Sequence, residues 1–170
     1  MKSPQRLALT LAGVVALSSP AVAATATSNL DVSASVAANC LISTAAVAFG
    51  AYDPVSANAS TALTGTGSVS VTCTSGSGAT ITLGQGDNAD AASTDAAPLR
   101  RMSDGAANVL SYGLYQDAGR TTEWGNTAGT GVAHLGTGSA TSITVYGSIP
   151  AGQSVPVGAY ADTVLATITF

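Results

Sequence analysis

Charged side chains are scarce in this sequence: 8% of its residues are Asp, Glu, Lys or Arg, and the formal net charge is -4. Beyond residue 23 there is no Lys at all, and three Arg residues stand against nine acidic residues. Loss of Lys2 and Arg6 with an N-terminal segment therefore moves the formal charge from -4 to -6. Nucleic-acid binding needs a basic surface, so this composition excludes it.

Long apolar runs are also missing. The one candidate, Leu7–Leu17, is shorter than the roughly 20 residues that a membrane-spanning helix needs. A basic start, this apolar core and the small residues Ala21–Ala23 are typical of a signal peptide over residues 1–23, cut there or one residue later. A retained anchor is the alternative. We therefore expect export through the inner membrane to the periplasm, and then to the cell surface or beyond, with no permanent membrane anchor.

Only two cysteines are present, Cys40 and Cys73. In an exported chain two cysteines most simply form one disulfide bond. A metal pair or a reactive thiol is the alternative, but two cysteines and one distant histidine, His134, cannot complete a four-ligand zinc site. The sequence therefore predicts a Cys40–Cys73 disulfide and no cofactor.

Residues with catalytic potential are few. His134 lies in a glycine-rich stretch without obvious partners and is expected in an exposed loop. Glu123 is a conceivable glycosidase acid, but no second carboxylate is designated for it, although Asp117 is close in sequence. No glycine-rich phosphate loop with a Lys is present. We therefore predict that the protein is not an enzyme.

The remaining pattern is that of an all-β protein of one domain. After removal of the signal segment about 147 residues remain, enough for a single core. Short β-branched runs alternate with clusters of Gly, Asn, Asp, Ser and Pro, which is typical of a sandwich or barrel. The predicted strands are 29–37, 41–50, 62–74, 78–84, 97–103, 107–116, 139–149 and 158–170, and the predicted loops are 51–61, 85–96 and 125–138.

The start of the mature chain alternates apolar and polar residues almost perfectly. Leu30, Val32, Ala34 and Val36 share one face of a strand. This segment is either an ordinary first strand of the sandwich or a detachable strand that completes the sheet of a neighbour. Composition alone does not separate the two interpretations.

The end of the chain has the same character. Val164, Ala166, Ile168 and Phe170 fall on one face at period two, and Leu165 is the large apolar residue on the other. Chain ends usually fray unless something holds them. A strand that runs to its last apolar side chain therefore predicts a C-terminus that is bound or buried.

Three groups of residues, in this order along the chain, resemble the spore coat protein U domain family, which includes major subunits of archaic chaperone–usher pili. They span nearly all of the mature domain. The groups are Asn39-Cys40-Leu41-Ile42 with Ala48-Phe49-Gly50; Leu114-Tyr115-Gln116-Asp117-Ala118-Gly119-Arg120 with Trp124-Gly125; and Tyr146-Gly147-Ser148-Ile149-Pro150-Ala151-Gly152 with Gly158, Tyr160 and Asp162.

The resemblance implies an immunoglobulin-like β-sandwich over residues 39–170 that lacks its last strand, preceded by a donor-strand extension over residues 24–38. A periplasmic chaperone would first lend a strand, and the extension of the next subunit would replace it at an outer-membrane usher, giving a homopolymer. It implies the donor residues Leu30, Val32, Ala34 and Val36. It also implies an acceptor and chaperone-binding edge at Val164, Ala166, Ile168 and Phe170, with basic chaperone residues holding the terminal carboxylate.

Three functions follow as hypotheses. The favoured one is a structural pilus subunit that supports adhesion and biofilm formation. The others are a non-polymerising spore or surface coat protein and a secreted carbohydrate-binding adhesin. Tyr115, Asp117, Arg120 and Trp124 are interpreted as a structural turn, pinned by an Asp–Arg contact and closed by Trp packing. The alternative for these four residues is a sugar-binding aromatic platform.

Overall fold

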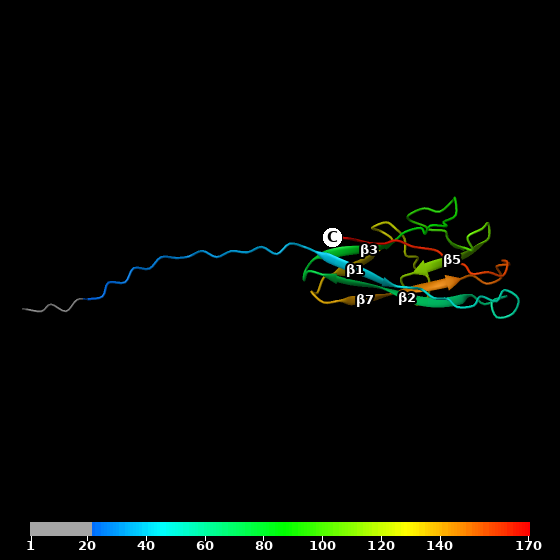
Figure 1. The fold of residues 1–170 in the computed structure, drawn as a ribbon, viewed down its shortest axis with the longest axis horizontal. Coiled ribbons are helices and arrows are strands. Elements are labelled where there is room, and N and C mark those ends of the chain that lie inside the picture. The colour runs from blue at the N-terminus through cyan, green and yellow to red at the C-terminus, as the bar shows by residue number, and fades with distance from the viewer. Residues whose placement is uncertain (1–21) are drawn as a thin grey trace, which may run out of the picture. The chain divides into compact units, whose positions relative to one another are not determined.

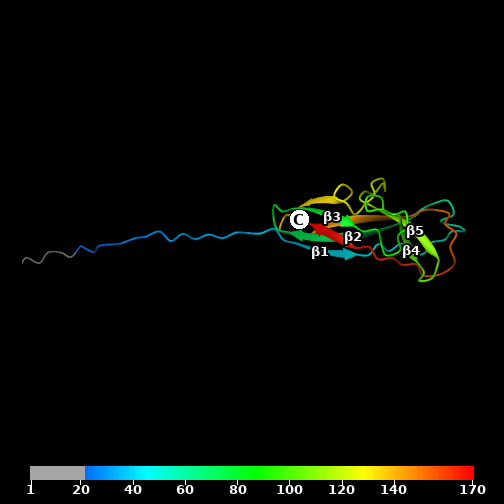
Figure 2. The same ribbon diagram turned by 90° about the horizontal axis from the view of Figure 1, so that it is seen from above.

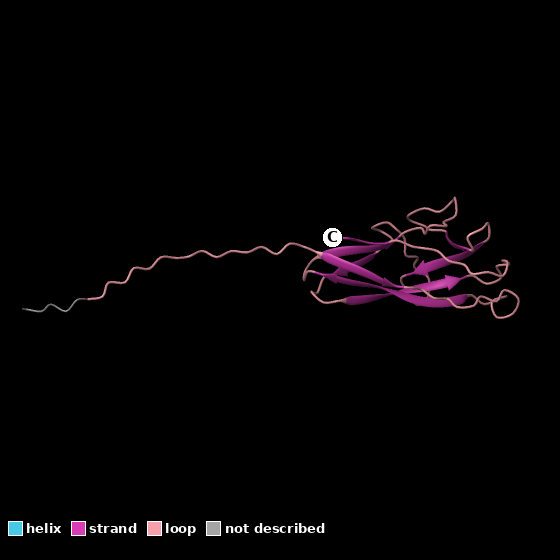
Figure 3. Cartoon of the chain, viewed as in Figure 1, coloured by secondary structure: helices cyan, strands magenta, loops and turns pink. Residues whose placement is uncertain are grey.

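The fold contains eight β-strands, and no helix occurs among residues 22–170, which the computed structural model describes (Figure 3). The strands are β1 (Cys40–Ala45), β2 (Leu63–Cys73), β3 (Gly78–Leu83), β4 (Arg100–Ser103), β5 (Val109–Tyr115), β6 (Val132–Leu135), β7 (Thr141–Ile149) and β8 (Ala166–Thr169). Most of the predicted signal segment, residues 1–21, lies outside the described part of the chain. Residues 22–35 precede the folded unit, Val36–Phe170.

The strands form two antiparallel sheets (Figures 1 and 2). The order in the larger sheet is β1-β2-β7-β5-β4, and the order in the smaller one is β6-β3-β8. The long pairing of β2 with β7, from Leu63 opposite Ile149 to Val71 opposite Thr141, is the centre of the larger sheet. The predicted all-β sandwich is confirmed.

The core follows from alternation along the strands. Val69 and Val71 of β2 and Ile81 and Leu83 of β3 are almost fully buried, because every second side chain of a strand points to the same face. Trp124, from the loop before β6, is also buried in this cluster. The two sheets therefore share one apolar interior.

Several strand boundaries differ from the sequence prediction. The segment 125–138 contains β6, although it was expected to be a loop, because four residues among glycines give little periodic signal. The predicted strand 158–170 shortens to β8, and 41–50 shortens to β1. Residues 29–37 form no strand, so the ordinary-first-strand interpretation is wrong for the chain as described.

The stretch after β1 approaches the larger sheet very closely. A Cβ atom added at Gly67 of β2 would lie 2.7 Å from the Ala45 carbonyl oxygen, and one at Gly147 of β7 would lie 2.6 Å from the Phe49 ring. Only glycine leaves room for such contact between backbone and neighbour. These glycines let Val47 and Phe49 pack against the sheet.

We expect Gly147→Ala to destabilise the domain by about 1–3 kcal/mol, the usual cost of overpacking a filled interior. The added methyl group would meet Val47 and Phe49 at 2.7 and 2.6 Å. The matched control is Gly129→Ala, because nothing lies within 4 Å of a Cβ atom at that position. Urea unfolding of both variants checks this expectation, and equal midpoints would contradict it.

Candidate functional site

Strand β8 is bonded on one side only. It pairs with β3, from Thr80 opposite Thr169 to Leu83 opposite Ala166. The same side continues upstream, where the Gly84 N–H donates to the Leu165 carbonyl (2.8 Å). Because backbone groups of successive strand residues point to opposite sides, those of residues 164, 166 and 168 face away from β3. No strand among residues 22–170 pairs with that side of β8.

Strand β1 has a second open edge. It pairs only with β2, and the Thr74 N–H extends this ladder by donating to the Asn39 carbonyl (2.9 Å). By the same alternation, the backbone groups of Ile42 and Thr44 face away from β2. Within the described residues this edge is unpaired as well. Unpaired strand edges are templates for the addition of another strand.

A groove lies between these two edges. Its first part is a hollow of about 460 Å³ between residues 44–49 on one side and 162–166 on the other. Its second part, about 690 Å³, lies between residues 47–54 and 155–160. The two parts share Val47, Phe49 and Met102. From the first part of the groove to the second, residue numbers rise on the side that begins at Thr44 and fall on the side that contains Asp162. The two sides therefore run antiparallel.

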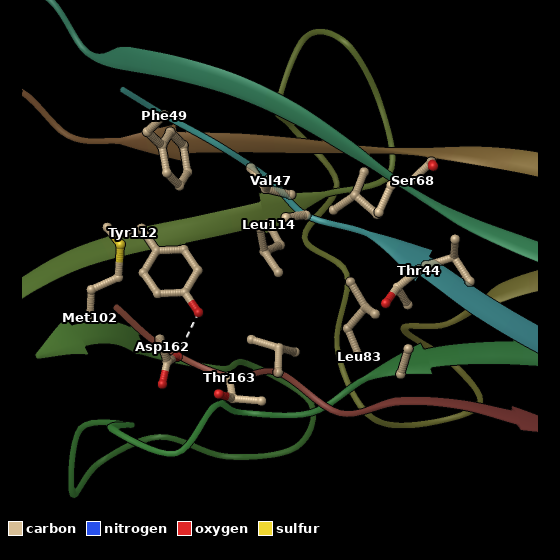
Figure 4. Close-up of a pocket in the computed structure, with 16 residues that line it drawn as sticks. Thr44, Val47, Phe49, Ser68, Leu83, Met102, Tyr112, Leu114, Asp162 and Thr163 are labelled. Carbon is tan, nitrogen blue, oxygen red and sulfur yellow. Dashed lines mark hydrogen bonds between the residues drawn. The ribbon is translucent and has the colours of Figure 1, made fainter. Parts of the chain in front are cut away.

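The floor of the first hollow is largely apolar. Leu83, Leu114 and Val47 point into it between the two edges (Figure 4). Its main polar feature is Tyr112, whose hydroxyl donates a 2.6 Å hydrogen bond to the Asp162 carboxylate. Burial, together with this carboxylate, raises the pKa of Tyr112 far above its ordinary value, so the hydroxyl remains a donor.

Two of the four predicted acceptor residues, Val164 and Ala166, line this groove, whereas Phe170 lines a separate hollow beside β3 and β6. Val164, Ala166 and Ile168 are half-buried against the core, whereas Leu165 between them is exposed. Phe170 is 53% exposed at the end of the chain. The period-two face that was predicted from sequence is therefore the face directed at the interior.

The predicted donor residues are unpacked. Leu30, Val32 and Val36 are 87%, 86% and 85% exposed, and Ala34 is exposed too. An alternating apolar face that packs against nothing is costly in water. The chain thus carries an unfilled groove and a strand-like segment without a partner.

The Spore Coat Protein U domain family matches residues 26–167, most of the chain. The chain belongs to this family. Protein U of Myxococcus xanthus is 52% identical over 170 residues, covering 96% of this chain and 95% of the relative. Membership in the spore coat protein U domain family was predicted from the sequence and is confirmed.

The fold of this spore coat protein U domain is also found among solved structures. One such structure is a chain of the CsuC–CsuE chaperone–tip adhesion subunit pre-assembly complex, from the archaic chaperone–usher Csu pili of Acinetobacter baumannii. The TM-score is 0.58 at 17% identity, so the likeness is one of fold. The match covers 79% of the present chain and 40% of the solved one, so this domain spans about two fifths of that chain's length.

The predicted disulfide of the spore coat protein U domain is confirmed. Cys40 and Cys73 are bonded, and they stand directly opposite each other where β1 meets β2. Next to them the Thr74 hydroxyl accepts a hydrogen bond from the Asn39 N–H (3.1 Å). The disulfide and this contact fix the point at which the N-terminal segment joins the domain.

The turn around Asp117 differs in detail from the prediction. The Asp117 carboxylate accepts from the N–H groups of Thr121 and Thr122, and the bond from Thr122 is the main reason that its pKa is lowered. The Arg120 guanidinium instead donates to the Gly147 carbonyl (2.9 Å), and Arg120 has a φ of 54°. The predicted contact between the Asp117 and Arg120 side chains is therefore wrong. Backbone N–H groups close in sequence occupy the carboxylate instead.

Trp124 is fully buried, and its Nε1–H donates to the Ile81 carbonyl (2.9 Å). The indole ring of Trp124 therefore packs in the core. A sugar-binding platform needs an exposed aromatic face, so Trp124 cannot supply one. Tyr115 is half-buried and forms an isolated bridge with Glu123.

Arg100 is the main feature that sequence reasoning missed. Its side chain is 1% exposed and donates to the carbonyls of Gly84 (2.8 Å), Leu83 (2.9 Å) and Trp124 (2.7 Å). Burial lowers the pKa of its guanidinium. These bonds hold the end of β3 and the Trp124 turn together beside the groove. One sequence signal could have revealed its role: Arg100 is a charged residue at a position of the predicted strand 97–103 whose side chain points inward.

The remaining chemical candidates are not assembled into a site. His134 lies in β6, half-buried, rather than in an exposed loop. Partial burial raises the pKa of Glu123, and Arg100 opposes the shift. No group of three His, Cys, Asp or Glu side chains among residues 22–170 is arranged to hold a metal ion. The same residues include no helix of the length and apolarity that a bilayer crossing requires.

Proposed function

We propose that this protein is a structural subunit of a surface fibre in which residues 24–38 of one copy fill the groove of the next. The observation that carries the proposal is the pairing of two unsatisfied features in one chain. The groove has two open strand edges and an apolar floor, and the N-terminal segment has the alternation and exposure of a strand without a sheet.

The energetics favour such an exchange. A strand in the groove would give hydrogen-bond partners to the open backbone groups of residues 164, 166 and 168. It would also bury Leu30, Val32 and Val36, each worth about 1.5–3 kcal/mol when fully removed from water. Ala34 contributes less. The segment is therefore able to bind by both backbone and side chains.

The geometry favours one direction of insertion. The start of β1 and the C-terminus lie at the same end of the domain (Figures 1 and 2), here called the disulfide end because β1 begins at Cys40. The second part of the groove lies at the other end, the loop end. If the segment enters at the loop end of the recipient, the recipient keeps its disulfide end free for the next junction. Domains then follow head to tail, with the inserted strand antiparallel to β8.

An unfilled groove is an aggregation hazard, so a subunit awaiting assembly needs temporary cover. We propose a periplasmic chaperone that lends a strand and an outer-membrane usher that catalyses replacement. The fold-level likeness to a chain of a chaperone–subunit complex from chaperone–usher pili supports this. Export by the signal segment 1–23, homopolymer formation, adhesion and biofilm formation belong to the same proposal.

A non-polymerising coat protein is the second candidate. It is favoured by the 52% identity to Protein U and by the family's name. The two candidates differ in whether the groove is filled by another copy. A carbohydrate-binding adhesin loses its main support, because Trp124 is buried.

The test is export of the full chain together with its chaperone, beside a variant that lacks residues 24–38. The variant should fold and co-purify with the chaperone, because residues 29–37 belong to no sheet, but it should form no filaments in electron micrographs. Val32→Asp should do the same, since a charge in an apolar pocket costs several kcal/mol. Ser33→Asp is its matched control and should assemble, because residue 33 faces the opposite way.

The possible outcomes separate the candidates. Filaments of normal length from the truncated subunit would refute donor-strand polymerisation. A wild-type chain that stays monomeric after release from the chaperone supports the coat protein. Loss of folding on truncation would show that residues 24–38 serve their own domain.

A further inference from the structure

A column of three side chains crosses the groove. The Phe49 ring, on one side, meets the Tyr112 ring edge-on with centroids 6.2 Å apart. The Tyr112 hydroxyl in turn reaches Asp162 on the other side at 2.6 Å. Figure 4 shows the three following one another from edge to edge. At this point the groove is therefore filled by side chains, and its surface is partly polar.

The column is held from outside the groove. The N–H and the side-chain amide of Asn88 donate to the second oxygen of Asp162 at 3.1 and 3.0 Å. Ala161 is bridged to Ser103 by two backbone hydrogen bonds of 2.8 and 2.9 Å. A Cβ atom on Gly86 would collide with the Asp162 carboxylate. Asp162 therefore cannot swing aside to admit a large side chain.

The N-terminal segment carries one small residue among its four groove-facing positions, Ala34. We infer that Ala34 of a second copy lies over the Phe49–Tyr112–Asp162 column and sets the register of the inserted strand. This inference rests on the proposed function and the antiparallel direction argued for it. Ala34 then stands opposite Asp162, Val32 opposite Val164 and Leu30 opposite Ala166.

Other registers fit less well. A slip by one residue would turn the apolar face of the segment to solvent. A slip by two residues would place either Val32 or Val36 over the column, next to the Asp162 carboxylate. The chosen register also sets Leu30, the largest of the four, opposite Ala166, the smallest side chain of the β8 face. Column and segment are therefore complementary in size.

Cysteine pairs in the full mature chain test the register. In the proposed register Ser33 stands directly opposite Thr163. The two residues form a non-hydrogen-bonded pair, in which the Cα atoms are about 4.5 Å apart, close enough for a disulfide bond. The double variant Ser33→Cys with Thr163→Cys should give a ladder of covalent oligomers on non-reducing gels of filaments. Ser33→Cys with Leu165→Cys, or with Ala161→Cys, should lose the ladder, because diagonal residues are about 7–8 Å apart.

A size test is independent of crosslinking. Ala34→Leu should abolish filament extension while chaperone capture persists, because the added atoms meet the column. Ser35→Leu is the matched control and should extend normally, since residue 35 faces the opposite way and its added atoms do not meet the column. A ladder from the Leu165 or Ala161 pair, or normal extension by Ala34→Leu, would overturn the register while filaments still form. Absence of wild-type filaments would overturn the proposed function as well.

Discussion

Ile168→Asp should prevent the protein from accumulating in soluble form when it is exported together with the proposed chaperone. Ile168 packs against the core on the inner face of β8, directly opposite Ile81, which is fully buried. A carboxylate there loses its hydration without gaining a partner, at a cost of several kcal/mol. We expect degradation or aggregation and loss of chaperone co-purification. The measurement is the yield of the periplasmic chaperone complex.

The matched control is Leu165→Asp, because Leu165 is 73% exposed and lies just before the same strand. It should leave the yield within the range of the wild type. Normal accumulation of Ile168→Asp as a soluble monomer would count against a functional terminal strand. Equal loss in both variants would point to a general intolerance of charge near the C-terminus.

Arg100→Leu should lower the free energy of unfolding by about 3–5 kcal/mol, because it removes the arginine donor from three carbonyl groups, two of them in buried hydrogen bonds. Arg100→Lys should recover little, since one ammonium group does not reproduce the planar fork of the guanidinium. Urea unfolding of the oxidised protein, with the disulfide intact, measures the loss.

Arg101→Leu serves for comparison. Arg101 is partly exposed, pairs with Asp90 at 3.0 Å and donates to two loop carbonyls. Its loss should cost much less, because water can replace these contacts. A similar loss of stability in both variants would contradict the role given to burial of Arg100.

Long alternating segments were predictable from sequence. The patterns around Val69 and Val71 and around Val145 located β2 and β7, because residues with one buried face repeat at period two. The disulfide followed from counting cysteines in an exported chain. Such features depend on local sequence and on composition.

Features made by distant segments were not predictable in this way. The groove forms because residues 44–49 and 162–166 lie on its two sides. Without the family resemblance, the sequence does not predict that these segments come together. The Phe49–Tyr112–Asp162 column joins three separate parts of the chain, and Arg100 acts through carbonyls, which carry no side-chain signature. In the Asp117 turn, the carboxylate accepts hydrogen bonds from nearby backbone N–H groups and not from the expected arginine side chain, because those N–H groups are nearer.

The arginine contacts have a consequence for proteolysis. Residues 22–170 contain no Lys, so Arg100, Arg101 and Arg120 are the places where trypsin can cut them. Each donates hydrogen bonds to carbonyls of the fold. A protease needs an extended, released segment around its target residue. In this domain the bonds that stabilise the fold also hold the backbone around its tryptic sites, so trypsin should cut the chain mainly after the segment around an arginine has opened.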